Sequence, residues 1–229
     1  HTTQCDSAQT RRPSTLIDFE FMQIIRPDLQ FTLVEQPADL PTHAQIIQGL
    51  PHIDSLYAVG FEINADWVET AYRRGLFPWY SEDEPILWHS PDPRMVLSLA
   101  DFKLSHSLKK RLRQWARTPE LGYQVTLNQC FDQVIQACAD TPRVGQDGTW
   151  INSTLKQAYM DLHCRQQALS VELWQHNQLV AGLYGVLIGK MFFGESMFTH
   201  ITDGSKVALA CWVRHLQTFG GEWIDCQQV

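Results

Sequence analysis

Three strand-like runs follow one another between residues 169 and 198, and they restrict the fold more than any other feature of the sequence. The runs cover 169–174, 179–188 and 191–198 and are rich in apolar and aromatic residues. His176-Asn177 and Gly189-Lys190 separate them and are typical of tight hairpin turns. The segment therefore predicts a three-stranded antiparallel meander.

Helical patterns lie on both sides of this meander. Residues 153–167 carry apolar positions at helical spacing before it. After it, Ser205 predicts the cap of a helix to about Phe219, Gly220-Gly221 ends that helix, and 223–226 form a last strand. The order helix, meander, helix, strand predicts an α+β fold and matches the core of acetyltransferase-like (GNAT-like) acyl-transfer folds.

Upstream of these elements the sequence predicts further helices and turns. Residues 105–117 suit a helix capped by Ser105 or Ser107, 123–127 a short strand, and 130–139 a second helix. An earlier helix follows a cap at Asn64 or Asp66 and stops at Gly75. Four prolines between 78 and 93 forbid a long helix there and place a domain boundary near Arg94.

These patterns give a division into three parts. Residues 1–18 are polar, and we expect them to be disordered. Residues 19–93 are expected to form a small N-terminal domain. Residues 16–50 are broken by prolines and suggest an irregular extension. Residues 94–229 are expected to form the larger acetyltransferase-like domain.

Composition excludes several classes of protein. The net charge of −7 argues against a chain that coats nucleic acid with its whole surface. No apolar run approaches the roughly 18 residues that a membrane span needs. Six cysteines show no Cys-x-x-Cys pair, which favours free thiols in a reducing cytosol, and nine scattered histidines show no metal-ligand spacing. We therefore expect a cytoplasmic protein with no metal and no membrane association.

One segment departs from the acidic background. Residues 103–117 contain six cations and no carboxylate, so the rest of the chain carries 12 cations against 25 acids, a net charge of −13. A helix with an apolar stripe and a cationic outer face could bind a phosphate backbone. The alternative is an ordinary solvated helix face.

Two polar clusters stand out within apolar strands. Glu195 lies among aromatic and apolar residues at 192–198, where a buried carboxylate needs a partner, a ligand or water. Asp225 and Gln227 are two apart on the last strand, which predicts a shared face where they could handle a proton, with Cys226 on the opposite face. The alternatives are a glutamate that reaches solvent at a strand edge, and strand-end side chains that bond neighbouring backbone.

Several motifs in a fixed order carry a resemblance to a known family. They are Ala71–Trp79, Ile86–Trp88, Ser90–Arg94, Gly148–Ile151, Glu172-x-Trp174, Gly185-Val186, Gly194–Phe198, Ser205-Lys206 and Ile224–Gln227. From about Tyr57 to its last residue, the chain resembles the leucyl/phenylalanyl-tRNA–protein transferases.

The resemblance implies an activity and its partners. Such an enzyme moves Leu or Phe, and by extension Met, from aminoacyl-tRNA to the N-terminal α-amino group of proteins that start with Arg or Lys. The product carries an N-terminal degradation signal. The resemblance also implies a monomer that needs no cofactor, because the aminoacyl ester is already activated.

The resemblance further implies roles for particular residues. Asp225 and Gln227 would assist removal of a proton from the attacking amine, and Glu195 would contact the polar end of the aminoacyl group or the adenosine. The expected adenosine contacts are Trp79, Trp150 and Tyr159. The pocket for the transferred side chain would contain Leu183, Phe192, Met197, Leu209, Trp212, Leu216 and Ile224. The tRNA acceptor stem would lie on Lys109, Lys110, Arg111 and Arg113.

The chain also departs from the family pattern. His89 stands where the family usually has a second Trp, and Trp212 and Leu216 stand where Phe is expected. The family continues beyond the position of Val229, so we expect a C-terminally truncated chain. Two other functions remain open at this point: a non-catalytic tRNA-binding remnant, and an acyl-CoA-dependent N-acyltransferase, against which the missing Gly-rich pyrophosphate loop counts.

Overall fold

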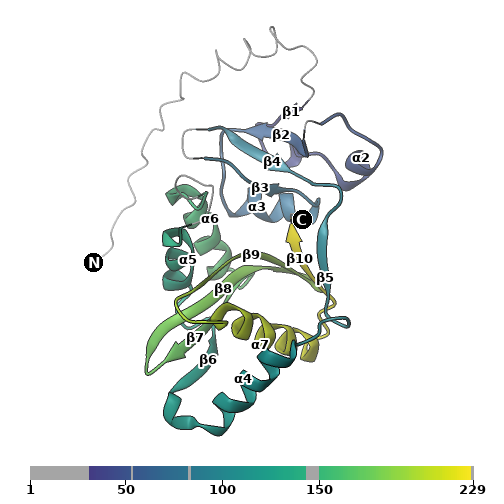
Figure 1. Ribbon diagram of the computed structural model, residues 1–229. Coiled ribbons are helices and arrows are strands. Elements are labelled where there is room, and N and C mark those ends of the chain that lie inside the picture. The colour runs from purple at the N-terminus through teal and green to yellow at the C-terminus, as the bar shows by residue number, and fades with distance from the viewer. Residues whose placement is uncertain (1–30, 53, 82–83, 143–149, 228–229) are drawn as a thin grey trace, which may run out of the picture.

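The protein folds around two β-sheets that lie next to each other (Figure 1). The computed structural model describes residues 31–227 except 53, 82–83 and 143–149. The first sheet has the order β1-β2-β4-β3, with bounds Thr32–Leu33, Leu56–Gly60, Ile86–His89 and Phe77–Pro78. The second has the order β5-β10-β9-β8-β7-β6, with bounds Met95–Ser98, Trp223–Gln227, Met191–Thr199, Gln178–Ile188, Ala168–Gln175 and Tyr123–Leu127.

Six α-helices and two short 3₁₀ turns accompany these sheets in the described residues. The helices are α2 (His43–Ile47), α3 (Ala65–Arg73), α4 (His106–Arg117), α5 (Phe131–Asp140), α6 (Ser153–Cys164) and α7 (Gly204–Thr218), and the 3₁₀ turns are η1 (Pro37–Asp39) and η2 (Pro119–Leu121). Of the two predicted caps, Asn64 is the one that caps α3, because its side chain accepts the backbone N–H groups of Asp66 and Trp67. Gly75, with φ +82°, follows the end of α3.

The predicted meander is confirmed. β7, β8 and β9 pair antiparallel in sequence order. His176 and Asn177 both have positive φ, 49° and 62°, as a two-residue turn that matches the strand twist requires. The last strand, β10, does not extend the meander at an edge. It lies between β9, to which it is parallel, and β5, to which it is antiparallel.

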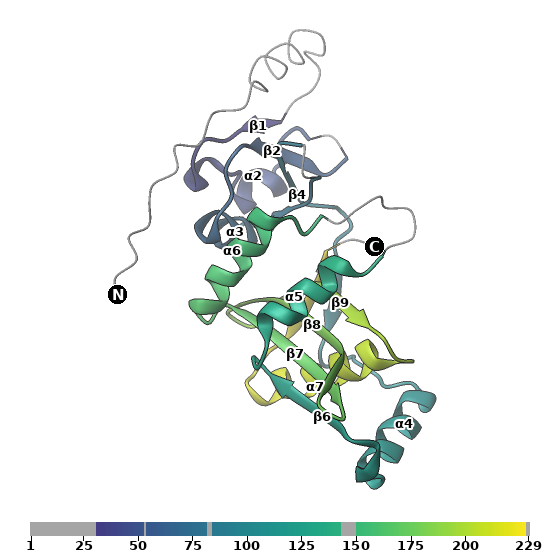
Figure 2. The same cartoon turned by 90° about the vertical axis from the view of Figure 1, so that its left-hand side faces the viewer.

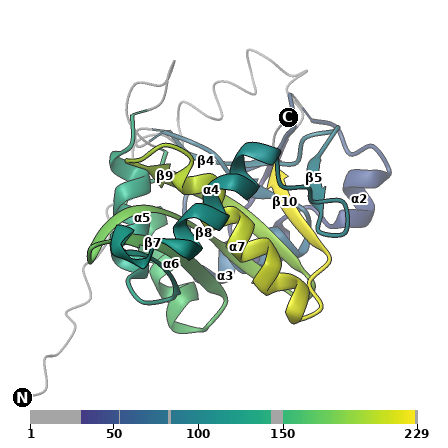
Figure 3. The same ribbon diagram turned by 60° about the horizontal axis from the view of Figure 1, so that its bottom comes forward.

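Helices cover both faces of the six-stranded sheet. α5 and α6 pack on one face in an apolar core that continues into the first sheet, while α7 packs on the other (Figures 1 and 2). Viewed with the bottom brought forward, α7 and α4 lie in front of the sheet (Figure 3). This arrangement is the mixed α+β fold that the sequence predicted. Of the helices that the structure describes, none has the length and apolar character to cross a membrane.

Three sequence expectations differ from the structure. Asp203, not Ser205, holds the N-cap position of α7, with a left-handed backbone and no side-chain cap bond. The helix predicted to Gln167 ends at Cys164. Residues 31–50 are not an irregular extension, because β1 joins the first sheet and Val34 and Leu40 are buried in its core. The prediction of disorder for 1–18 lies outside the described residues.

Candidate active site

A β-bulge at Glu195 sets the centre of the candidate site. In the ladder between β8 and β9, Tyr184 pairs with Ser196 and Gly185 pairs with Gly194, so Glu195 is an extra residue without a partner. Such a bulge bends the strand and redirects a side chain. Here the bulge turns the Glu195 carboxylate toward α3 and α6.

Gly185 makes this bulge sterically feasible. A Cβ atom at this position would lie 2.1 Å from the carbonyl oxygen of Phe193 and 2.5 Å from the ring of Phe192. The backbone and a buried ring cannot both move aside, so a larger residue would push β9 away from β8. The glycine is needed here for close approach of two strands.

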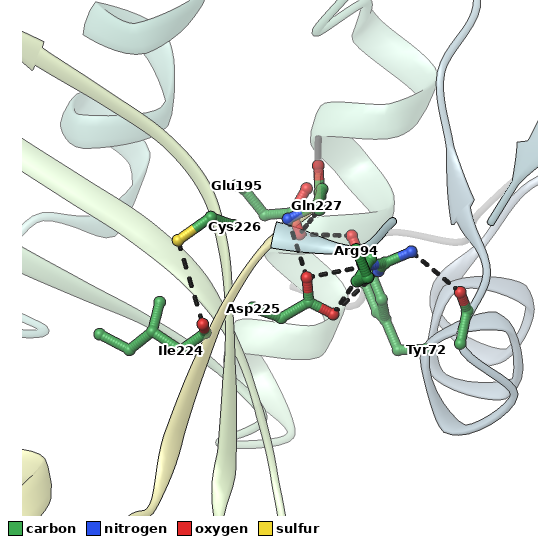
Figure 4. A network of polar contacts seen from close by, with 8 residues as sticks. Tyr72, Arg94, Glu195, Ile224, Asp225, Cys226 and Gln227 are labelled. Atoms are coloured by element: carbon green, nitrogen blue, oxygen red, sulfur yellow. Dashed lines mark hydrogen bonds and ion pairs between the residues drawn. The ribbon is translucent and has the colours of Figure 1, made fainter. Parts of the chain in front are cut away.

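The Glu195 carboxylate accepts three hydrogen bonds from three different elements. The hydroxyl of Tyr72, on α3, donates to Oε1 over 2.5 Å, and that of Tyr159, on α6, donates to Oε2 over 2.7 Å. The amide Nε2 of Gln227 donates to Oε1 over 2.9 Å. The two tyrosine oxygens are themselves 2.8 Å apart. Figure 4 shows Glu195 beside Gln227, close to the end of β10.

These surroundings change the acidity of the groups involved. Burial raises the pKa of Glu195 to about 7, although hydrogen bonds from Tyr72, Tyr159 and Gln227 favour the ionised form. Burial and the nearby carboxylate raise the pKa of both tyrosines well above 10, so they stay neutral donors. Glu195 can therefore exchange a proton near neutral pH, which is what a general base requires.

A second bulge shapes the end of β10. Asp225 pairs with Val96 and Gln227 pairs with Met95, so Cys226 is the extra residue. Gln227 has a left-handed backbone with φ +66°, and its N–H donates to Oδ1 of Asp225 over 2.8 Å. The bulge, rather than simple strand alternation, brings Asp225 and Gln227 together and leaves the Cys226 side chain exposed.

Arg94 is a site residue that sequence reasoning missed. Its Nε and Nη2 donate to Oδ1 and Oδ2 of Asp225, each over 2.9 Å, and its Nη1 donates to the carbonyl of Gly75 over 3.1 Å. Its guanidinium also lies 4.9 Å from the centre of the Phe77 ring. Asp225 is only 3% exposed, so the arginine neutralises a buried carboxylate. The Ser90–Arg94 motif contained Arg94 but did not indicate its partner.

Tyr72 was also missed. It lies inside the Ala71–Trp79 motif and within the helix that the sequence predicts before Gly75. Its ring is buried and packs 4.8 Å from the ring of Phe193. Only the fold brings its hydroxyl to Glu195.

Most of the residues expected to form the apolar pocket gather in one cluster. Leu183, Phe192, Trp212, Leu216 and Ile224 are all buried between the sheet and α7, and Leu209 packs against them. The rings of Phe192 and Trp212 meet edge to face at 4.9 Å. Met197 lies outside this cluster and is 46% exposed. Phe192 and Ile224 are paired residues on neighbouring strands, one position before the pair that contains Asp225.

The three aromatic residues expected around adenosine differ in exposure. Trp79 is 40% exposed, with its ring edge-on to His89 at 5.9 Å. Trp150 is half-buried against the core that also contains Tyr159. Tyr159 is fully buried and its ring meets Tyr184 at 5.4 Å. Stacking on a base needs an accessible ring face, and Trp79 offers much more of one than Tyr159 does.

The basic helix α4 forms as predicted, with Ser105 accepting the N–H of Leu108. Lys109, Lys110 and Arg113 are exposed, whereas Arg111 is half-buried and forms an ion pair with Asp203 over 3.1 Å. In Figure 1, α4 lies at the end of the molecule away from the end of β10. Within the described residues, no group of three or more His, Cys, Asp or Glu side chains could hold a metal ion.

Comparisons with known proteins identify a family for this chain. Residues 96–229 match the family model described as leucyl/phenylalanyl-tRNA protein transferase, and residues 61–92 match the model of its N-terminal domain. A leucyl/phenylalanyl-tRNA–protein transferase from Bordetella avium is 52% identical over 79% of this chain and 73% of its own length. One from Bordetella petrii is 48% identical over 89% of this chain and 77% of its own length.

Among solved structures, the chain is similar to a C-terminal DUF2156 domain from Agrobacterium fabrum. The TM-score is 0.42 at 14% sequence identity, over 75% of this chain and 54% of that one. Because the TM-score is low, this likeness does not assign a fold. The two family models and the close relatives show that the chain belongs to the leucyl/phenylalanyl-tRNA–protein transferase family.

Proposed function

We propose that the protein transfers Leu or Phe, and by extension Met, from aminoacyl-tRNA to the α-amino group of proteins that begin with Arg or Lys. The product would carry an N-terminal degradation signal. Membership of the family supports the reaction. The observation that supports this site is a Glu195 carboxylate with a pKa of about 7, held by three donors from α3, α6 and β10.

The proposed chemistry is direct aminolysis of an ester. The amine nitrogen of the acceptor attacks the aminoacyl carbonyl carbon, a C–N bond forms, and the ester C–O bond to the tRNA ribose breaks. The amine loses a proton and the leaving ribose hydroxyl gains one. No covalent enzyme intermediate is needed, so positioning and proton transfer account for the catalysis.

Glu195 is the proposed group that takes the proton. Both of its oxygens are held by neutral donors, so its position is fixed while its protonation state can change. Gln227 would contact the reacting groups together with Glu195, and Asp225 would act through Gln227. The resemblance implied a contact with the aminoacyl group or the adenosine for Glu195 and proton handling for Asp225 and Gln227; Glu195 takes the proton acceptor's role here instead.

The apolar cluster between the six-stranded sheet and α7 is the proposed pocket for Leu or Phe. Phe192 and Ile224 lie on the two strands that also carry Glu195 and Asp225. Leu183, Leu209, Trp212 and Leu216 would complete the wall, with Met197 at its exposed rim. Apolar shape discriminates between side chains by only about 1–3 kcal/mol per methylene.

We assign the terminal adenosine to Trp79 and Trp150. Stacking on an aromatic face contributes about 1–3 kcal/mol per base. The ring of Tyr159 is buried, so we do not assign it a stacking role. Its hydroxyl would instead hold Glu195 in place.

The exposed cations of α4 are the proposed binding surface for the acceptor stem. Lys109, Lys110 and Arg113 would contact phosphates, and Arg111 would contribute less because Asp203 already neutralises it. Such contacts fix the orientation of the tRNA and do not read its sequence. The acidic remainder of the chain suits an acceptor with a cationic first residue.

The remaining parts of the proposal concern organisation. Residues 19–93 would form a small N-terminal domain, and 94–229 a GNAT-like aminoacyl-transfer domain. The two sheets and the two family models support this division. The protein would work as a cytoplasmic monomer without a cofactor.

One experiment tests the function directly. The protein is incubated with radiolabelled leucyl-tRNA or phenylalanyl-tRNA and a peptide that starts with Arg. We expect label in the peptide, and none in a matched peptide that starts with Glu. Absence of label together with retardation of tRNA in a gel would favour a non-catalytic tRNA-binding protein. Transfer from an acyl-CoA donor alone would favour an acyl-CoA-dependent N-acyltransferase.

A further inference from the structure

Arg94 occupies a position that the reaction itself does not explain. It directly precedes β5, in the segment that joins the two sheets. Its side chain is mostly buried and points at Asp225, which is 131 residues away in the sequence. Figure 4 shows Arg94 bonded to Asp225 on one side, while on the other side its Nη1 donates to the carbonyl of Gly75.

The contacts of Arg94 occupy both oxygens of Asp225. Oδ1 accepts Arg94 Nε over 2.9 Å and the backbone N–H of Gln227 over 2.8 Å. Oδ2 accepts Nη2 over 2.9 Å and Nε over 3.1 Å. Bidentate arginine–carboxylate pairs are strong and geometrically specific. A carboxylate held in this way suits orientation of a neighbour better than proton transfer.

That neighbour is Gln227. The bond from its N–H to Asp225 supports a left-handed backbone at Gln227, a conformation that non-glycine residues seldom adopt. With the backbone in this conformation, its amide donates to Glu195 over 2.9 Å. A continuous chain of bonds therefore runs from Arg94 through Asp225 and Gln227 to the proposed base.

We propose that Arg94 is a positioning residue for the transfer reaction, which fixes Gln227 against Glu195 through its bidentate bond to Asp225. The inference rests on the proposed function. Arg94 is in turn held from the other side by the Gly75 carbonyl and the Phe77 ring. Gly75 lies three residues after Tyr72, one of the donors to Glu195. Arg94 therefore contacts the chain close to Tyr72 and, through Asp225, also holds Gln227, another donor to Glu195.

The test compares Arg94→Ala and Arg94→Lys with a matched control. Arg165→Ala removes an arginine that forms an exposed ion pair with Asp66 and, among the residues that the structure describes, has no bond to Asp225 or Gln227. We expect kcat to fall about 100-fold in Arg94→Ala, with KM for aminoacyl-tRNA unchanged, because a misplaced group slows the chemical step rather than binding. Added guanidinium should restore part of the kcat, and Arg165→Ala should match the wild type.

A double-mutant cycle separates positioning from general support of the fold. If Arg94 acts through Asp225, the combination of Arg94→Ala with Asp225→Asn should lower kcat no further than Asp225→Asn alone. Multiplied losses would overturn the proposal, as would an Arg94→Ala variant with wild-type kcat. If Arg94→Ala fails to fold, the same cycle with Arg94→Lys, which keeps the charge and loses the fork, gives the same two outcomes.

The wild-type protein distinguishes this inference from the proposed function. If the wild type transfers neither Leu nor Phe, the proposed function fails and the role of Arg94 fails with it. If the wild type is active and the Arg94 variants keep its kcat, the role of Arg94 alone is refuted.

Discussion

The Glu195 network and helix α4 both concentrate charge, but they differ in what neutralises it. The charges of the network are bonded within the molecule, whereas most of those on α4 are left for a partner. At Glu195 and Asp225, each charged side chain is buried or half-buried and bonded to groups from other elements. On α4, Lys109, Lys110 and Arg113 are exposed on one helix and lie where a partner could approach. The contribution of the first region to catalysis should depend on its geometry, and the contribution of the second to tRNA binding should depend on the number of charges.

This difference predicts how each region responds to change. Moving one atom of a bonded network by an ångström can slow a reaction about 100-fold without altering substrate binding. Removing one exposed cation weakens phosphate binding by a modest, salt-dependent amount. Variants of the first region should therefore affect kcat, and those of the second should affect tRNA affinity.

Glu195→Gln should have the largest effect. It keeps the shape of the side chain and removes the proton acceptor, so kcat should fall by about 10²- to 10⁴-fold. Single-turnover transfer from phenylalanyl-tRNA measures this change. Glu222→Gln is the matched control, because Glu222 pairs with Lys190 at an exposed site. A Glu195→Gln variant as fast as the wild type would contradict the assignment of Glu195 as base.

Asp225→Asn should follow, with a kcat about 100-fold lower and little change in the Kd for tRNA. The substitution also breaks a buried ion pair, so urea unfolding must show that the variant is folded under assay conditions. Equal losses in transfer and in tRNA binding would show that Asp225 has no specific part in the chemical step.

The pH dependence gives a smaller, graded effect. The pKa of Glu195 is raised to about 7, so the fraction of ionised base falls about tenfold for each pH unit below that value. The kcat should therefore rise with pH up to about 7 and then level off. Single-turnover rates between pH 5 and pH 9, in buffers of constant ionic strength, provide the measurement. The same inflection in Glu195→Gln would assign it to another group.

Stability should change with pH in the opposite direction. Because the pKa of Glu195 is raised in the folded state, its carboxyl is more easily ionised in the unfolded chain. Its burial therefore costs nothing below the unfolded pKa of about 4.5 and costs increasingly more up to about pH 7, on the order of 1–3 kcal/mol. In chemical denaturation, the free energy of unfolding of Glu195→Gln should rise relative to that of the wild type between about pH 4.5 and pH 7. A difference in unfolding free energy that stays constant over this range would contradict the raised pKa of Glu195.

Substitutions on α4 should have the smallest single effects. Lys109→Gln, Lys110→Gln and Arg113→Gln should each lower the slope of log affinity against log salt by about 0.9. Arg111→Gln should lower it less, because Asp203 already pairs with Arg111. Fluorescence titration with uncharged tRNA at several salt concentrations tests both statements. An unchanged slope in the combined variant would mean that α4 is only a solvated face.

The sequence predicted the parts of the fold that depend on local pattern. The meander, the basic helix and the cap at Asn64 all follow from spacing and turn residues, and all are present. Ser205 was wrong as a cap because the chain enters α7 through a left-handed Asp203. Residues 31–50 were misjudged because prolines there separate short elements that are stabilised by burial in a tertiary core.

The site was only partly predictable. Glu195 was singled out because a buried carboxylate within an apolar strand is costly, and Asp225 and Gln227 because their spacing on one strand predicted a shared face. Tyr72 and Arg94 gave no such signal: one lay within a predicted helix, and the other at a predicted domain boundary. Both acquire their role from partners more than 120 residues away. The two bulges could not be predicted from the sequence either. A bulge is an extra residue relative to the paired strand, so it can be identified only when the pairing of the two strands is known.

The central position of β10 has a consequence for how the molecule folds. A strand inserted between β5 and β9 must find one neighbour far back along the chain, and such distant pairings are slow because loop closure precedes any gain in contacts. Arg94, Asp225 and Gln227 meet only when this pairing forms. A refolding chain should thus recover most of its helix before it recovers catalytic competence, and the delay between the two would time the insertion of a single strand.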